Sequence, residues 1–297
     1  MRFLKPEEYR ELLTKGIPEN VEERIGEIFF ENTKLRRLFK QYYGVHLKNI
    51  LSTPYFVQRM LLPFKTLPSS EGRRLEIETG NITFLEKLIL NRRSPYKLKD
   101  HIMDFKILSN ILYYSYGITK KKEMEIIDEW NNKIKVFYYY RPTPSAGGLY
   151  PHEIYIIALR VSGIDPGIYH YNPFESIIEK VSSSYKLRVL EGKLWEIFTG
   201  LPEEPWLVGI IITAIPNRQV IKYFSRAYRF IFLEAGHIAQ NISLLATANG
   251  LGVLPVGGYY DDELISLLNI DQRIEIPIYP LFVGKPKSTK KEIKSGY

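Results

Sequence analysis

The stretch that decides the fold is Pro144-Ser145-Ala146-Gly147-Gly148-Leu149-Tyr150-Pro151. Prolines restrict the backbone at both ends of this segment, and the small residues between them leave its N–H groups accessible. We therefore expect a stiff loop whose backbone can approach a planar ligand. The alternative is an ordinary turn between two strands.

Strand and helix patterns extend outward from this loop. The apolar run Leu207–Ile215 is uninterrupted, which predicts a strand covered on both faces. A long helix is predicted from Tyr228 to Asn249, with Gly250 as its C-terminal stop. The other expected elements are helices at 82–90, at 103–115 and near 261–262, a strand at 153–161, a hairpin at 167–171 and 177–181, and strands at 251–256 and 276–283. Strands mixed with long helices, without regular βαβ alternation, predict an α+β fold.

Two further segments carry chemistry. Arg92-Arg93-Ser94 offers two guanidinium groups and a hydroxyl, which suit a phosphate because arginine donates charge-assisted hydrogen bonds to its oxygens. Pro255-Val256-Gly257-Gly258 follows a predicted strand, and its glycines permit close approach to a ring system. Alone, the first could be a pair of solvated arginines and the second a common turn. Together with the loop at 144–148, they predict a site for a flat, phosphorylated cofactor.

Composition narrows the classes of function. The 297-residue chain has no cysteine, which excludes disulfides, thiol catalysis and cysteine-ligated metal. Its net charge is +8, but residues 285–297 hold five lysines and one acid, so 5 − 1 = +4 of that charge belongs to one terminal tail. A basic terminus is usually a solvated tail. We therefore expect no nucleic-acid partner; salt-sensitive binding of DNA through the tail is the competing hypothesis.

The sequence lacks several common signatures. It contains neither GxGxxG nor GxxxxGKS/T, and its five histidines share no metal-ligand spacing, so no metal site is expected. The segment Met1–Glu11 is charged and has no apolar core typical of a signal peptide. The apolar run at 207–215 is too short to span a bilayer. We expect a cytoplasmic protein with no membrane partner.

These motifs occur in a familiar order. The chain resembles the SagB-type dehydrogenases of the FMN-dependent nitroreductase superfamily over most of its length. The resemblance rests on Glu31-Asn32-Thr33-Lys34, Pro63-Phe64-Lys65, Arg92-Arg93-Ser94, 113–118, 144–151, 166–171, Glu234-Ala235-Gly236-His237, Gln240-Asn241 and 255–258. The octapeptide at 144–151 is the most specific of them.

The resemblance implies a nitroreductase fold, with a central, mostly antiparallel sheet flanked by helices, in an intertwined homodimer that binds FMN at its interface. It assigns the phosphate and ribityl chain to Arg92, Arg93 and Ser94, with further positive charge from Lys285 or Lys287. The loop Pro144, Ser145, Ala146, Gly147 and Gly148 would reach the flavin from the partner subunit. Pro255, Val256, Gly257 and Gly258 would line the isoalloxazine ring. Residues 1–80 would form a family-specific extension and residues 81–297 the FMN-binding domain.

One position departs from the family pattern. Members often carry a basic residue two positions after the serine, where this chain has Tyr96. Lys97 is next along the chain and is the candidate replacement. The contact to the ribityl chain or the pyrimidine edge of the flavin depends on it.

The resemblance also points to Lys222-Tyr223, which occupies the stretch where azoline-oxidising members carry a Lys-Tyr pair. Either side chain could act as general base while a hydride passes to the flavin. The alternative is a surface lysine beside a packed tyrosine. His237 is expected to be a hydrogen-bonded core or interface residue rather than a catalytic one.

We therefore expect an FMN-dependent oxidoreductase, with dehydrogenation of azoline rings in a modified peptide as one version. The alternative version is a reductase that uses NADH or NADPH to reduce nitroaromatics, quinones or enones. A third hypothesis, from another class, is a non-catalytic flavin-binding scaffold protein.

Overall fold

The computed structural model describes residues 25–37, 40–54, 80, 82–127, 131, 133–181 and 185–287. The motif Pro63-Phe64-Lys65 and the tail beyond Lys287 lie outside the described residues. Most of the expected N-terminal extension also lies outside them, so the domain division at residue 80 stays a prediction. Within the described part, α2 spans Ile25–Thr33 and α3 spans Lys40–Ser52.

A six-stranded sheet forms the centre of the fold, with strand order β5-β4-β3-β6-β8-β7. Every neighbouring pair in it is antiparallel. The strands are β3 (His152–Ala158), β4 (Gly167–Asn172), β5 (Ile177–Lys180), β6 (Val208–Ala214), β7 (Gly252–Pro255) and β8 (Ile276–Gly284). All seven residues of β6 are buried, as its continuous apolar run predicts. The expected α+β class and antiparallel sheet are confirmed.

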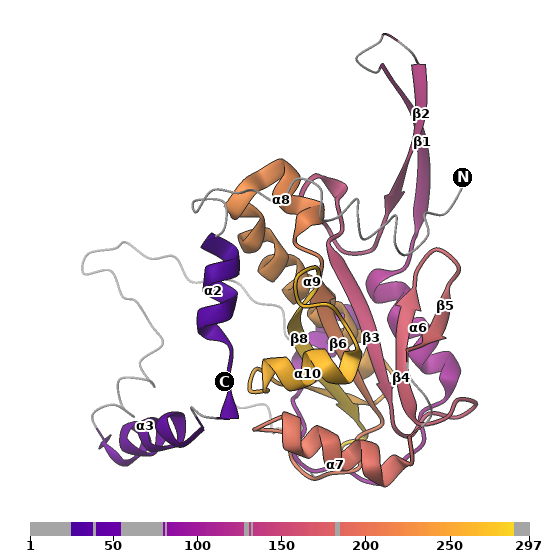
Figure 1. The fold of residues 1–297 in the computed structure, drawn as a ribbon. Helices are drawn as coiled ribbons and strands as arrows, with labels where there is room; N and C mark the ends of the chain where they lie inside the picture. The colour runs from indigo at the N-terminus through magenta and orange to yellow at the C-terminus, as the bar shows by residue number, and fades with distance from the viewer. Residues whose placement is uncertain are drawn as a thin grey trace, which may run out of the picture.

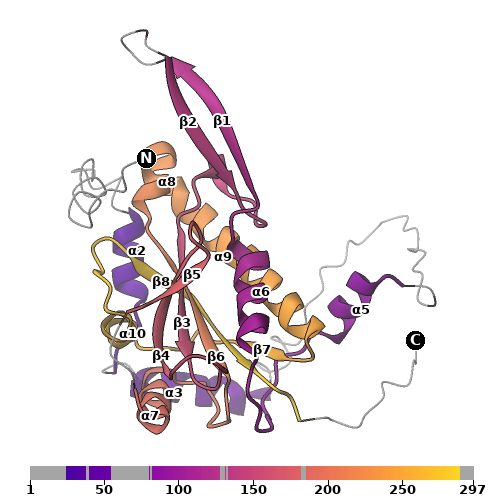
Figure 2. The same ribbon diagram turned by 90° about the vertical axis from the view of Figure 1, so that its right-hand side faces the viewer.

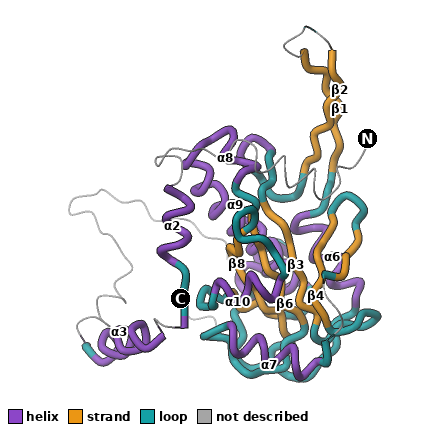
Figure 3. Tube along the Cα trace, viewed as in Figure 1, coloured by secondary structure: helices purple, strands orange, loops and turns teal. Residues whose placement is uncertain are grey.

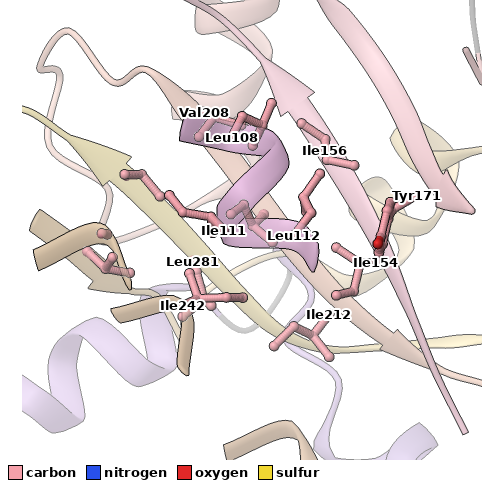
Figure 4. Close-up of a cluster of buried hydrophobic side chains, with 14 of the residues drawn as sticks. Leu108, Ile111, Leu112, Ile154, Ile156, Tyr171, Val208, Ile212, Ile242 and Leu281 are labelled. Atoms are coloured by element: carbon pink, nitrogen blue, oxygen red, sulfur yellow. The ribbon is translucent and has the colours of Figure 1, made fainter. Parts of the chain in front are cut away.

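Helices cover both faces of this sheet (Figures 1 and 2). On one face, α6 (Phe105–Tyr116) and α9 (Ala227–Ala248) pack against β3, β6 and β8. Figure 4 shows this layer, in which Leu108 of α6 lies near Val208 of β6 and Ile242 of α9 lies near Leu281 of β8. On the other face, α7 (Leu187–Ile197) and α10 (Asp261–Leu268) enclose a second apolar cluster.

Local signals set the helix boundaries. Thr83 caps α5 (Phe84–Asn91) through a reciprocal capping box with Glu86, and Asp104 caps α6. Gly250 has φ 64°, a left-handed conformation suited to glycine, just beyond the end of α9. The helices predicted at 82–90, 103–115 and 228–249 are thus confirmed to within two residues at each end.

Several elements were not predicted, α2 and α3 among them. The strands β1 (Lys120–Ile127) and β2 (Lys133–Tyr140) form a separate antiparallel hairpin that projects from the body of the molecule (Figure 3). The helix α7 buries Leu190, Leu194 and Ile197, but it also carries apolar residues outside that stripe, such as the exposed Val189. The short helix α8 (Asn217–Tyr223) precedes a 3-10 turn, η3 (Phe224–Arg226), that leads into α9.

Candidate functional site

The loop at 144–148 is fixed by hydrogen bonds as well as by its prolines. The Ala146 backbone N–H donates to the Glu234 carboxylate over 2.7 Å, and the Tyr150 N–H donates to the Ser145 hydroxyl over 2.8 Å. The segment Ala146–Gly148 forms a 3-10 turn, η2. Gly147 and Gly148 have φ of 63° and 67°, which glycine adopts without strain.

A buried carboxylate lies beneath this loop. Glu234 projects from α9 and is only 5% exposed. The Gln219 side-chain amide donates to the same Glu234 oxygen, over 2.7 Å. Burial raises the pKa of Glu234, and the hydrogen bonds from Ala146 and Gln219 partly offset that rise. Sequence reasoning gave no role to Glu234 or Gln219, although Glu234 opens one of the family motifs.

The structure places Lys222 and Tyr223 against the loop. They end α8, and a β-carbon built on Gly147 would lie 2.7 Å from the Tyr223 hydroxyl and 2.9 Å from the Lys222 amine. Tyr223 packs edge-on against Phe230, with ring centroids 5.1 Å apart. Phe224 then turns the chain with φ 49°, a strained conformation for a non-glycine residue. The lysine is exposed and the tyrosine half-buried, so a substrate could reach both.

The predicted phosphate residues gather at the other end of α9. Arg92, Arg93 and Ser94 follow α5, and the ring of Pro95 lies 2.7 Å from where a β-carbon on Gly252 would stand. The Lys285 amine lies 3.0 Å from the corresponding position on Gly250. Among the described residues, no carboxylate forms an ion pair with Arg92, Arg93 or Lys285. This region therefore has the charge that a phosphate needs.

The contacts of Tyr96 and Lys97 show whether Lys97 is free to replace the basic residue that the family often has at position 96. Tyr96 is exposed, and the Lys97 amine forms an ion pair with Glu204 at 3.1 Å. The Lys287 N–H donates to the Lys97 carbonyl over 3.0 Å, which joins the two segments through their backbones. Lys97 is therefore already engaged in this chain, and its use as a replacement would require breaking that pair.

The segment Pro255–Gly258 leaves β7 and leads to α10. The Val256 N–H donates to the Pro280 carbonyl over 3.0 Å, and the Gly258 carbonyl accepts from the Thr199 N–H over 2.9 Å. A β-carbon on Gly257 would meet nothing within 4 Å. The backbone at Gly257 is thus held on both sides but open to a ligand.

An N-terminal motif holds the helix that follows this segment. The Lys34 side chain is 6% exposed and its amine pairs with Asp262 at 3.1 Å and Glu31 at 2.7 Å. The Leu35 N–H donates to Asp261 over 2.9 Å. Because Asp261 and Asp262 begin α10, the motif containing Lys34 fixes the first turn of that helix.

The two groups of site residues are far apart within one chain. Glu234 holds the loop, and Gly250 touches Lys285; they are 250 − 234 = 16 positions apart on one helix and its cap. At about 1.5 Å of rise per residue, they are separated by roughly 24 Å along the axis. His237 lies between them on an exposed face of α9. Its prediction as a core residue is wrong for the single chain, because it points away from the sheet; an interface position stays a prediction.

The described residues lack two further kinds of feature. None of the helices there combines the length and apolarity that a membrane crossing requires. In the same part of the chain, no three histidine or acidic side chains gather in a way that could hold a metal ion.

A profile described as "Nitroreductase family" matches residues 89–285. The chain belongs to the nitroreductase family. An inferred nitroreductase of Methanocaldococcus jannaschii is 30% identical over 217 residues, which cover 72% of this chain and 98% of that protein. The microcin B17-processing protein McbC of Escherichia coli is 30% identical over 157 residues. That match covers 50% of this chain and 56% of McbC.

A solved structure has a similar fold. The E. coli microcin synthetase McbBCD complex, with truncated pro-MccB17 bound, contains a chain that superposes with a TM-score of 0.59 at 20% identity. The superposition covers 80% of this chain and 84% of that one. The predicted nitroreductase fold and superfamily membership are confirmed, and the likeness to McbC supports the SagB-type branch.

Proposed function

We propose that the chain is an FMN-dependent oxidoreductase of the SagB type that binds its cofactor between two copies of itself. Bound FMN would supply a hydride acceptor. The donor set fits this group. Arg92, Arg93, Ser94 and Lys285 offer guanidinium, hydroxyl and ammonium donors for a phosphate, and the open backbone at Gly257 suits a flat ring.

The separation along α9 supports a site shared by two subunits. The basic region and the loop at 144–148 are roughly 24 Å apart along the helix, further than a mononucleotide can bridge. A complete site would therefore combine Arg92–Ser94 and Pro255–Gly258 of one subunit with Pro144–Gly148 of the partner subunit.

Exposed apolar side chains support the same homodimer. Leu85 and Leu90 on α5, Tyr114 on α6 and Leu233 on α9 are each more than half exposed. Isolated exposed hydrophobic residues are normal, but several on neighbouring helices mark an interaction surface. A second copy packed there would cover them and bring the two halves of the site together.

Lys222 and Tyr223 would do the acid–base work. Both lie against Gly147, so wherever the loop reaches the partner's cofactor, the pair arrives with it. The Lys222 amine or the Tyr223 hydroxyl would remove a proton from the substrate carbon as the hydride leaves. Thiazoline or oxazoline rings in a modified peptide are the proposed substrates, a proposal that the likeness to the microcin B17-processing protein McbC supports.

The observation that carries this proposal is the contact of both side chains with Gly147. We expect Lys222→Ala and Tyr223→Phe to lose about 100-fold or more in azoline oxidation, the usual contribution of a general base. Both variants should retain full FMN occupancy, read from the visible spectrum. Lys193→Ala on α7, an exposed lysine away from the loop, is the matched control. Full activity of both variants would refute the assignment.

The alternative function is reduction of nitroaromatics, quinones or enones by NADH or NADPH. The match to the inferred nitroreductase of Methanocaldococcus jannaschii, which covers 98% of that protein, favours this alternative function. Anaerobic bleaching of the flavin bands by NADPH would support this function, and bleaching only by an azoline peptide would support dehydrogenation. A colourless protein that takes up no added FMN would refute both.

A further inference from the structure

A cavity lies at the base of the projecting hairpin and borders the loop at Gly148, on the face of the sheet opposite α9. Its volume is about 830 Å³. Aromatic side chains from β2 and from the turn after β4 form its walls, among them Phe137, Tyr139 and Phe174. Tyr139 and Phe174 meet edge to face, with centroids 4.8 Å apart, and so join the hairpin to the sheet.

The floor of this cavity is ionic, and most of its charge is internally neutralised. Glu153 pairs with Arg218 at 2.5 Å and with the His170 Nε2 at 2.7 Å. Burial alone would raise the pKa of Glu153, but Arg218 and His170 together lower it to about 2. The second nitrogen of His170 faces Glu179 at 3.4 Å. These groups satisfy one another without a ligand.

Glu275 is the exception. It is 9% exposed, and its two oxygens accept from the Thr213 hydroxyl over 2.5 Å and the Tyr155 hydroxyl over 3.2 Å. Among the described residues, neither lysine nor arginine pairs with it. Burial, with the nearby charge of Glu153, raises the pKa of Glu275 to about 7. A buried carboxylate without a cation is costly to ionise, so a cation supplied from outside would be bound favourably.

The arginines on the cavity wall do not supply that cation. The guanidinium of Arg141 lies over the rings of Tyr116 and Tyr150, at 4.1 and 5.2 Å. Arg218 is paired with Glu153. The cavity therefore presents aromatic walls and the carboxylate of Glu275, while its guanidinium groups are held by tyrosine rings and by Glu153.

We propose that this cavity binds an organic cation, an ammonium or guanidinium group on an apolar stem, with Glu275 as its counter-ion and the aromatic walls around the stem. Aromatic faces attract such cations, and an ion pair with a desolvated carboxylate adds to that attraction. A lysine or arginine side chain of a peptide and a free alkylamine share this chemistry. Binding here requires no flavin chemistry, so it can be tested whatever reaction the chain performs.

The test uses the full chain as purified and calorimetric titration with N-acetyl-lysine methylamide. We expect it to bind at least about tenfold more tightly than the uncharged N-acetyl-norleucine methylamide, because only the lysine compound supplies a cation. Butylamine separates the two sources. Equal affinity would assign recognition to the cation and its stem, and weaker binding would assign part of it to a peptide backbone.

Variants connect the binding to Glu275. Because the carboxylate must be ionised, affinity should rise about tenfold between pH 6 and pH 8 in the native chain. His170 also titrates, with a pKa that its hydrogen bond to Glu153 raises despite burial. Glu275→Gln should lower affinity at least about tenfold and leave only the pH dependence that His170 contributes. Glu175→Gln, an exposed acid in the turn after β4, is the charge-matched control and should bind as the native chain does.

Phe174→Ala provides a second variant that folding cannot confound, because this side chain is 52% exposed. It should weaken binding about threefold by removing one aromatic face. Equal binding of the lysine and norleucine compounds, or unchanged binding by Glu275→Gln, would overturn the proposal.

Discussion

The two ends of helix α9 differ in how they are built. Toward the N-terminal end, one buried acid holds the loop at 144–148: Glu234 accepts hydrogen bonds from the Ala146 N–H and from the Gln219 side-chain amide. At the C-terminal end, Arg92, Arg93 and Lys285 gather with no acid beside them among the described residues. The polar groups at the loop end bind one another, whereas among the described residues the cations at the basic end have no carboxylate partner.

This difference indicates that each end is half of a site. The loop end carries the reactive side chains Lys222 and Tyr223, and its guanidinium groups are already engaged, Arg218 with Glu153 and Arg141 with tyrosine rings. The basic end carries the cations but no general base. Because a rigid helix keeps the two ends apart, only a second subunit could combine them.

Mixing two inactive variants is the strongest test of whether each end of α9 is half of a shared site. In a mixed dimer, one subunit carries Arg92→Ala/Arg93→Ala and the other carries Lys222→Ala. One of the two shared sites would then receive both defects, and the other site would receive neither. Random pairing makes half of the dimers mixed, so about a quarter of native activity should return. Each variant alone should retain about 1% or less.

The measurement is the oxidation activity of the protein after co-expression of the two variants. If both halves of the site belonged to one subunit, every site in the mixture would carry one defect and no activity would return. Mixing Lys222→Ala with Tyr223→Phe is the matched control, because both defects then lie in the same half.

The acids on the loop side of the molecule give a second test, through the pH dependence of the free energy of unfolding. The pKa of Glu153 falls from 4.5 to about 2 on folding, so its stabilisation is present above pH 4.5 and lost as the pH falls through 2. The pKa of Glu275 rises from 4.5 to about 7, so its stabilisation is present below pH 4.5 and lost as the pH rises through 7. Each shift corresponds to on the order of 3 kcal/mol.

The variants should therefore respond to pH in opposite directions. Between pH 5 and pH 9, Glu275→Gln should gain stability relative to the native chain by about 3 kcal/mol, since only the native chain must ionise this buried group. Glu153→Gln should be destabilised at pH 7, and the difference should shrink toward pH 3. Urea unfolding at several pH values measures both. Parallel pH profiles for the two variants would contradict the opposite shifts.

Alanine substitutions in the loop should have a smaller effect, and they test the contact between the loop and the pair Lys222 and Tyr223. Replacing Gly147 or Gly148 with alanine should lower the free energy of unfolding by a similar amount, about 1 kcal/mol, because both positions have a left-handed backbone. Only at Gly147 does the added carbon meet the Tyr223 hydroxyl and the Lys222 amine; at Gly148 it meets nothing within 4 Å. Gly147→Ala should therefore lower turnover at least about tenfold more than Gly148→Ala, because the pair is displaced. Equal turnover in the two variants would argue against a role for the pair.

Local signals made much of the fold predictable. The strand β6 is a continuous apolar run, and α9 repeats its apolar residues at helical spacing up to Gly250, so both were predicted from periodicity. The projecting hairpin was missed because it buries little. The strand β1 begins with three lysines, and its apolar Met124 and Ile127 are exposed, so no alternation of buried and solvated residues marks it.

The residues of the candidate site also fall into two groups, those that the sequence predicts and those that it does not. The octapeptide at 144–151 and the arginines at 92–93 are recognisable because their chemistry lies in consecutive residues. Glu275 and Gln219 gave no such signal, since each is an ordinary polar residue until the strands around it remove it from water.

The sequence by itself determined the class of fold, the helix ends and the family, because turns, caps and periodicity depend on neighbouring residues. Only the tertiary structure brought Lys222 and Tyr223 against Gly147 and set the basic residues at the far end of α9. It also buried Glu275 with no lysine or arginine partner among the described residues. Those arrangements depend on contacts between segments that are distant in the chain. Their energies come from burial and charge pairing, which no local pattern specifies.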